Sequence, residues 1–141
     1  MRTAFAVWIE TMADGELIVT CRDLPEVLTS GRTESEALEM AEDALDVAVS
    51  AAMDDGRPVP EPTALRKAEH LVNLPAQTAA KLSVWRAFVA SGISKSELAR
   101  RLGVGENEAR RILSPRYRTK LDKLEAAARA LGGRIIVDFA A

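Results

Sequence analysis

The sequence contains one cysteine, Cys21, and one histidine, His70, among its 141 residues. A single cysteine cannot form an internal disulfide, and one cysteine with one histidine cannot build a zinc cluster. No catalytic signature surrounds either residue. We therefore interpret Cys21 as a buried thiol in a strand and His70 as a structural residue, and we expect no metal site and no cofactor.

Aromatic residues make up only 4% of the chain, which argues against a large aromatic-lined ligand pocket. No apolar run approaches the roughly 20 residues of a membrane-spanning helix. The N-terminal stretch reaches Glu10 too early for a secretory signal. We therefore expect a cytoplasmic protein that does not enter a membrane, with an apolar content of 48% that is sufficient for a folded core.

The motifs of the common nucleotide-binding and hydrolase folds are absent: there is no Walker loop, no GxGxxG and no nucleophile elbow. One enzyme hypothesis remains, a metal-dependent nuclease related to RNase H. Its carboxylates would have to be Glu10, Asp14, Glu16 and Asp23. These acids fall at expected strand ends and turns, where carboxylates are ordinary, so we predict that the chain is not an enzyme.

The net charge of −2 hides an uneven distribution of charge. Up to Ala64 there are 4 basic and 14 acidic residues, a net charge of −10, whereas the rest has 15 basic and 7 acidic residues, a net charge of +8. A chain with an acidic and a basic half is expected to bind two partners of opposite charge. DNA suits the basic half and a basic protein suits the acidic half.

The N-terminal half predicts a small α+β domain over residues 1–74. Alternating apolar residues and the Asp14-Gly15 turn predict a hairpin of strands at about 3–10 and 16–21, with a short third strand at 27–30. Thr33, with Glu36 three residues later, predicts the start of a helix that ends near Asp55-Gly56. The proline-rich connector 57–63 follows, and residues 70–74 complete a β-β-β-α-β order.

The C-terminal half, residues 75–141, predicts an all-α domain with a helix-turn-helix in the stretch GISKSELARRLGVGENEARRILS, from Gly92 to Ser114. Ser94 and Glu97 form a capping box at the first helix, Gly103 permits the tight turn, and Val104 is expected to fill that turn. A helix before this motif and one after it, from residue 121 to the glycines at 132–133, would complete the domain.

Residues on the outer face of the second helix are of types that contact base edges and phosphates in a major groove. We predict that the DNA-binding residues are Asn107, Arg110, Arg111 and Ser114, with Arg116, Tyr117 and Arg118 of the following loop. In the acidic half, we expect the helix carboxylates Glu39, Glu42 and Asp46 to steer a basic protein partner.

The segment from Arg134 to Phe139 is apolar and β-branched, so it predicts a terminal strand. A lone strand in a helical domain has an unpaired edge. A twofold-related copy would supply the missing strand, so we predict a homodimer through the C-terminal domain, or a tetramer built from two such dimers.

Both halves together resemble the HicB antitoxins of bacterial toxin–antitoxin pairs, in the branch that carries a helix-turn-helix. The first half carries the resemblance in DGELIVTCRDLPEVLTSGRTESEALEMAEDALDVAV followed by GRPVPEP, and the second in GISKSELARRLGVGENEARRIL and LDKLEAAARALGGRIIV. The sequence departs from the family at Gly105, where a Ser or Thr usually opens the second helix. It also has Glu106 and Glu108 near the expected DNA surface.

The resemblance implies a partial RNase H-like fold without RNase activity in the N-terminal domain. That domain would bind and occlude a HicA-type toxin, a small basic ribonuclease, while the C-terminal domain would bind double-stranded operator DNA and repress the operon. The alternative is a stand-alone helix-turn-helix repressor whose N-terminal domain senses a ligand or mediates assembly.

Overall fold

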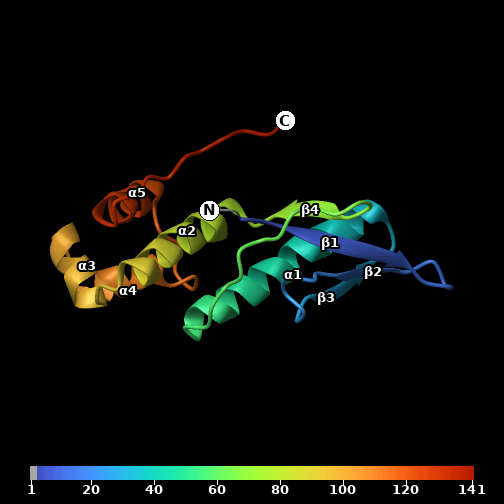
Figure 1. The fold of residues 1–141 in the computed structure, drawn as a ribbon, viewed down its shortest axis with the longest axis horizontal. Coiled ribbons are helices and arrows are strands. Elements are labelled where there is room, and N and C mark those ends of the chain that lie inside the picture. Colours follow the sequence, from blue (N-terminus) through green and yellow to red (C-terminus); the bar gives the residue numbers. More distant parts are fainter. Residues whose placement is uncertain (1–2) are drawn as a thin grey trace. The chain divides into compact units, whose positions relative to one another are not determined.

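The computed structural model describes residues 3–141, which form two compact units. Unit 1 ends at Ala79 and unit 2 begins at Ala80, so the boundary lies inside a helix. Along the described chain (Figure 1) the elements are β1 (Ala4–Thr11), β2 (Leu17–Thr20), β3 (Leu28–Gly31), α1 (Glu34–Asp54), β4 (His70–Asn73), α2 (Ala76–Ser91), α3 (Lys95–Leu102), α4 (Glu106–Leu113) and α5 (Leu121–Ala130).

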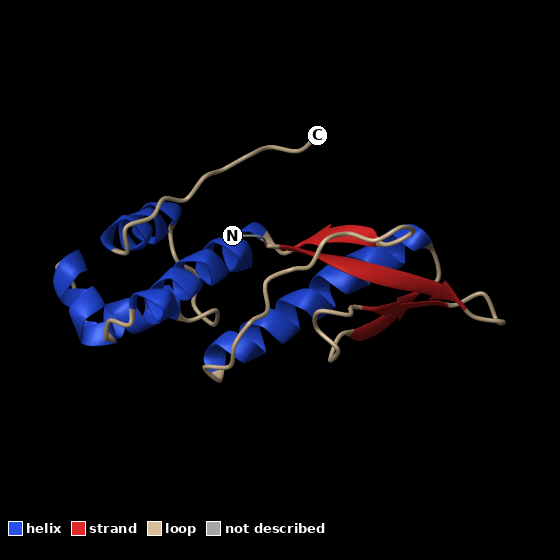
Figure 2. Ribbon diagram, viewed as in Figure 1, coloured by secondary structure: helices blue, strands red, loops and turns tan. Residues whose placement is uncertain are grey.

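Unit 1 is built on an antiparallel sheet with the strand order β3-β2-β1-β4 (Figure 2). The hairpin between β1 and β2 closes at Gly15, whose φ of 86° favours glycine. β1 pairs with β2 along its second half and with β4 along its first half, because residues 70–73 return to the sheet as the sequence predicts. The resulting order of elements is the predicted β-β-β-α-β.

Helix α1 covers one face of this sheet. Its start is the predicted N-cap, because the Thr33 side chain accepts a hydrogen bond from the backbone N–H of Glu36 at 3.1 Å. The Glu36 carboxylate accepts the N–H of Arg32 at 3.2 Å. The helix buries a stripe of small and branched residues that includes Ala41, Leu45 and Val49, against Phe5, Val7 and Val19 of the sheet. These residues form the core of unit 1.

Unit 2 contains α3, α4, α5 and most of α2 around one apolar cluster. Leu98, Ile112 and Leu124 come from three different helices and are at most 3% exposed. The mixed α+β class is confirmed, with the sheet and its helix first and helices after it. None of the helices in the described chain is long and apolar enough to cross a membrane.

Two expectations for unit 2 differ from the structure of the single chain. Residues 134–139 form no strand within it; they are extended coil whose Ile136, Val137 and Phe139 side chains are 84%, 75% and 88% exposed. A strand needs a partner for its ladder hydrogen bonds, and no described segment of the chain pairs with these residues. The expected filling of the α3–α4 turn by Val104 is wrong, because this side chain is 37% exposed.

Candidate nucleic-acid interface

The two short helices α3 and α4 are joined by a tight turn that the local sequence explains. The Ser94 side chain accepts the N–H of Glu97 at 3.1 Å and begins α3. Gly103 ends it with φ 68° and ψ 31°, and the N–H of Val104 reaches back to the carbonyl of Ala99 at 3.0 Å. This is the hydrogen-bond pattern of a left-handed glycine cap. Helix α4 starts at Gly105 without a side-chain cap.

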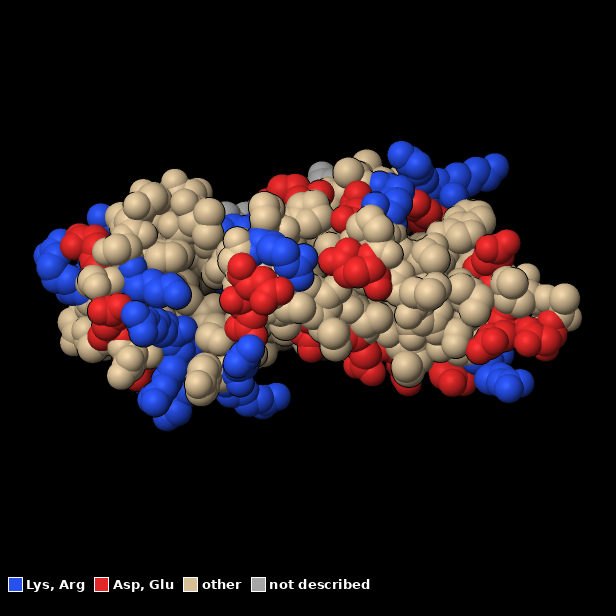
Figure 3. All heavy atoms as spheres, turned by 90° about the horizontal axis from the view of Figure 1, so that it is seen from below, with Lys and Arg blue, Asp and Glu red and all other residues tan. Residues whose placement is uncertain are grey.

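Packing fixes which side of α4 faces outward. Ala109, Ile112 and Leu113 are buried in the cluster of unit 2, and Ala99 of α3 is 4% exposed, as expected for the small residue at this contact. Asn107, Arg110 and Arg111 are exposed, at a helical spacing that places them on one surface. In Figure 3 basic side chains gather over this unit, drawn in blue.

The two glutamates of α4, Glu106 and Glu108, are paired with cations on this surface. Glu106 accepts a hydrogen bond from Arg110 at 2.7 Å, and Glu108 accepts one from the Lys123 ammonium of α5 at 2.5 Å. The Lys123 hydrogen bond, the largest influence, lowers the pKa of Glu108. Both carboxylates therefore have a cation beside them, which offsets the repulsion that a nearby phosphate would feel.

The loop after α4 adds a second group of basic residues. Ser114 is half-buried, and its hydroxyl accepts the N–H of Arg116 at 3.3 Å, whereas Arg116, Tyr117 and Arg118 are exposed. The Arg111 guanidinium lies 5.8 Å from the centre of the Tyr117 ring, within the range of a cation–π contact. This contact joins the exposed face of α4 to the loop.

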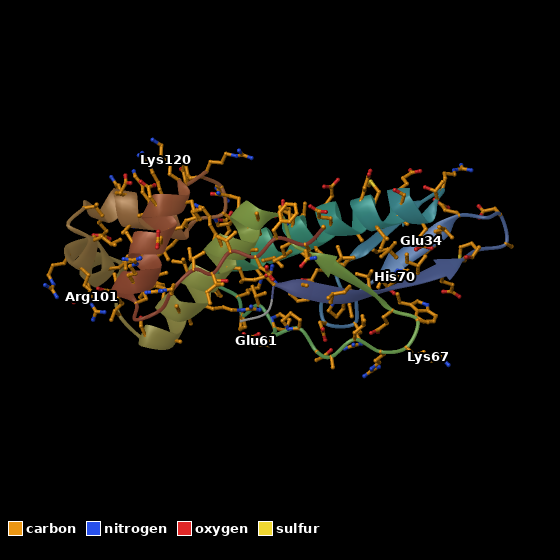
Figure 4. The ribbon with its side chains drawn as sticks, turned by 90° about the horizontal axis from the view of Figure 1, so that it is seen from above. Glu34, Glu61, Lys67, His70, Arg101 and Lys120 are labelled. Carbon is orange, nitrogen blue, oxygen red and sulfur yellow. The ribbon has the colours of Figure 1, made fainter. Side chains whose placement is uncertain are left out.

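A hollow of about 350 Å³ lies between α4, this loop and the start of α5. Its lining includes four cations and one carboxylate: Arg111, Arg118, Lys120, Lys123 and Glu108. The prediction from sequence missed Lys120, which follows the loop directly, and Lys123, which the packing of α5 against α4 brings beside Glu108. Figure 4 shows Lys120 and Arg101 pointing away from unit 2 on different sides.

Lys81 of α2 is a buried cation that the sequence did not mark. It is 1% exposed, and its ammonium donates hydrogen bonds to the carbonyls of Arg111 at 2.9 Å and Ser114 at 2.6 Å. These are carbonyls at the C-terminal end of α4, where a cation also interacts favourably with the helix dipole. Burial lowers the pKa of Lys81 to about 8. Lys81 thus ties the end of α4 to α2.

The predicted steering residues of unit 1 lie on α1, but they are not equivalent. Glu39 and Glu42 are exposed, whereas Asp46 is half-buried and accepts the Thr78 hydroxyl at 2.6 Å. The carboxylate of Asp46 is therefore already engaged within unit 1.

The residues weighed for catalysis do not converge. Asp14 accepts the N–H of Glu16 in the hairpin turn, Glu16 accepts the Ser30 hydroxyl at 2.9 Å, and Asp23 binds Thr63. Across residues 3–141 no group of three or more His, Cys, Asp or Glu side chains could hold a metal ion. These carboxylates therefore have structural hydrogen-bond partners.

The cysteine and the histidine each have a structural environment. Cys21 is 2% exposed, and burial raises the pKa of its thiol, which disfavours the nucleophilic thiolate. His70 lies beside Glu34 of α1, with Nδ1 3.9 Å from the carboxylate (Figure 4).

Comparison with known proteins covers both units. Residues 5–83 match a family model described as the HicB_like antitoxin of bacterial toxin-antitoxin systems. An antitoxin HicB of Pseudomonas fluorescens (strain Pf0-1) is 38% identical over 128 residues, which span 90% of this chain and 88% of that protein. An antitoxin HicB of Escherichia coli (strain K12) is 36% identical over 91% of this chain and 93% of its own length. Antitoxin HicB 2 of Photorhabdus laumondii is 42% identical over 78% of each chain.

Proposed function

The chain belongs to the HicB-like antitoxin family, and on this premise we propose that it neutralises a HicA-type ribonuclease toxin and represses its own operon. The observation that carries the proposal is the division of charge between the two units. Residues 1–79 have 6 basic and 15 acidic residues, and residues 80–141 have 13 basic and 6 acidic residues. The first unit suits a basic protein and the second suits DNA.

Unit 2 is the proposed operator-binding domain, with α3 and α4 as a helix-turn-helix. Asn107, Arg110 and Arg111 would enter the major groove from α4. The side chains of Arg116, Tyr117 and Arg118 would bind phosphates beside them, joined by Lys120 and Lys123 at the basic hollow. Ser114 remains a proposed contact through the exposed part of its half-buried side chain.

The apolar tail supports a homodimer. Ile136, Val137 and Phe139 are at least 75% exposed, which is costly in water for side chains of this size. A second copy that pairs its own tail with this one would supply ladder partners and cover these side chains. The same twofold axis would place two copies of α4 on successive half-sites of the operator. Two such dimers could pair into a tetramer.

Unit 1 is the proposed toxin-binding domain, with a partial RNase H-like layout and no catalytic role. Its carboxylates at the strand ends bind partners within the unit, which supports a role in binding and none in cleavage. The chain would act in the cytoplasm, where both the toxin's RNA targets and the operator are found.

A short open reading frame for a small basic protein beside this gene favours the antitoxin, and its absence favours the stand-alone repressor. Co-expression with that small basic protein tests the first half of the proposal. We expect the two proteins to co-purify and the growth arrest caused by the small protein to be relieved. If this chain binds its operator but neither binds nor neutralises the small protein, a stand-alone repressor is the correct reading.

Arg110→Ala combined with Arg111→Ala tests the second half. Loss of these phosphate or base contacts should weaken operator binding and reduce the salt dependence, by about 0.9 in the log–log slope for each lost phosphate contact. Arg129→Ala is the matched control, because Arg129 is an exposed arginine of α5 paired with Glu125 at 2.8 Å. An unchanged slope in the double variant would refute the assignment to α4.

A further inference from the structure

Unit 1 has an open apolar groove beside α1, along the edge strand β3. Its volume is about 570 Å³, and the uncharged side chains in its lining include Met40, Ala44, Val47, Ala51 and Thr29. All of these residues belong to α1 or β3, within unit 1. The groove therefore exists in one copy of the chain without any contribution from unit 2.

Apart from Ala48, which is 7% exposed, the apolar side chains in this groove are not part of the core. The buried stripe of α1 includes Ala41, Leu45 and Val49, which face the sheet. Val47 and Met40 lie outside that stripe and are 70% and 39% exposed. The small alanines at 44 and 51 leave the space between them open. Exposed apolar side chains that flank a hollow are typical of a surface that binds another protein.

Charge selects the kind of protein that fits. Asp43 and Glu26 also line the groove, and Glu39 lies one helical turn before Asp43. Arg57 is a cation in the lining, but its guanidinium lies 3.4 Å from the Asp55 carboxylate. Helix α1 contains seven acidic residues and no basic one. In Figure 3 acidic side chains, drawn in red, lie in several places around uncharged surface on this unit.

We propose that this groove is the docking site of the toxin. This proposal rests on the proposed function and makes it more specific. The occupant is a segment of a small basic protein that inserts apolar side chains between Met40 and Val47. Its lysine or arginine side chains face Asp43 and Glu26, with Glu39 adding attraction at longer range. Apolar contact supplies most of the affinity, and the carboxylates supply orientation and association rate.

Side-chain insertion explains the site better than addition of a strand to the sheet edge. β3 has only four residues, so an added strand would gain few ladder hydrogen bonds. Leu28, the first residue of β3, is 70% exposed and also lines the groove. It pairs with Thr20, which pairs with Trp8, so by register it shares the sheet face of Trp8. Leu28 therefore lies at the rim where the groove meets that face.

The sheet face that carries Trp8 is the competing surface for the toxin, and it provides a matched control. Leu71 of β4 pairs with Ala6, so it lies on the same face as Trp8, and it is 56% exposed. Val47→Asp and Leu71→Asp each place one carboxylate on an exposed apolar position of unit 1. They differ in whether that position lines the groove.

The experiment measures the affinity of each full-length variant for the small basic protein encoded beside this chain, by calorimetry. We expect Val47→Asp to weaken binding by at least about 30-fold, the loss typical of a central interface residue. Leu71→Asp should change the affinity by less than about 3-fold, as at a position outside the interface. Thermal unfolding of both variants checks the fold, and Val47→Ala, which adds no charge, replaces Val47→Asp if that variant unfolds.

The outcomes distinguish a failure of the docking proposal from a failure of the proposed function. If the wild-type chain does not bind the small protein, the proposed function is wrong. If the wild-type chain binds and the Val47 variants bind equally well, the groove is not the docking site while the antitoxin function stands. A loss caused by Leu71→Asp instead assigns docking to the sheet face that carries Trp8. Reduced self-association of Val47→Asp with unchanged toxin affinity assigns the groove to a second copy of this chain.

Discussion

The buried ammonium of Lys81 yields a prediction that depends on both geometry and pH. Replacing Lys81 by Met keeps an unbranched side chain of similar length but removes the donor to the carbonyls of Arg111 and Ser114. The Ser114 carbonyl would still accept a long hydrogen bond from the N–H of Tyr117 at 3.5 Å. The Arg111 carbonyl would still accept one from the N–H of Ser114 at 3.3 Å. Neither is a full replacement for a charged donor.

Two opposing free-energy contributions set how far Lys81→Met changes the stability of unit 2. The shift of the Lys81 pKa from 10.5 to about 8 corresponds to at most about 3 kcal/mol of cost for burying the charge, and solvent screening reduces this to roughly 1–2 kcal/mol. That cost is already part of the wild-type stability. Depriving two buried carbonyls of their donor costs about 1–3 kcal/mol each. We therefore expect Lys81→Met to destabilise unit 2 by about 1–3 kcal/mol at pH 7.

The pH dependence has a definite sign. Between pH 8 and 10.5 the unfolded chain keeps the Lys81 proton while the folded chain releases it. The unfolded state then binds more protons than the folded state. The contribution of Lys81 to the free energy of unfolding of the wild type therefore rises with pH through that window. Lys81→Met lacks the titrating group. The stability difference between wild type and variant should therefore widen from pH 8 to 10.5.

Denaturant unfolding followed by Trp85 fluorescence measures this difference, in a Trp8→Phe background so that unit 2 alone reports. Lys95→Met, at an exposed lysine of α3, is the control and should show no such pH dependence. Faster amide exchange at residues 111–117 should accompany the loss. A variant as stable as wild type at pH 7, or a difference that stays constant up to pH 10.5, would refute the reasoning.

Three further changes test other parts of the structure. Gly31→Ala should destabilise unit 1 by roughly 1–3 kcal/mol or more, because its Cβ would lie 2.5 Å from the backbone nitrogen of Ala37; an unchanged melting temperature would contradict this close approach. Glu106→Gln should free Arg110 from its carboxylate at 2.7 Å and strengthen operator binding, and weaker binding in a gel-shift titration would instead mean that the carboxylate itself contacts a base. Ile136→Asp combined with Phe139→Asp should convert a dimer to monomer in analytical ultracentrifugation, and a persistent dimer would place the interface elsewhere than the exposed tail.

Local chemistry explains why much of the fold is predictable. The caps at Thr33 and Ser94 and the left-handed Gly103 depend on residues within four positions of each other, and the structure confirms all three. The end of α1 before Gly56 and the return of residues 70–73 to the sheet also follow from short patterns. The same short range explains why residues 134–139 form no strand in the single chain, because apolar and β-branched residues favour a strand but do not supply its ladder partner.

The candidate interface was predictable only in part, for a related reason. Periodicity along α4 identifies Asn107, Arg110 and Arg111 as outward-facing, and they are exposed. The pairing of Glu108 with Lys123 joins residues of different helices, which no pattern within one helix reports. Val89 illustrates the same limit: it is an apolar residue of α2 whose side chain is 56% exposed.

The sequence by itself determined the element order, the helix caps, the charge division and the family. These depend on residue identity and on the spacing of near neighbours along the chain, and both can be read from the sequence alone. Only the tertiary structure decided that Lys81 is buried against the end of α4, and that Met40 and Val47 flank an open groove instead of joining the core. Burial and pairing across elements depend on which surfaces meet, and a side chain such as lysine or valine fits either environment until its neighbours are in place.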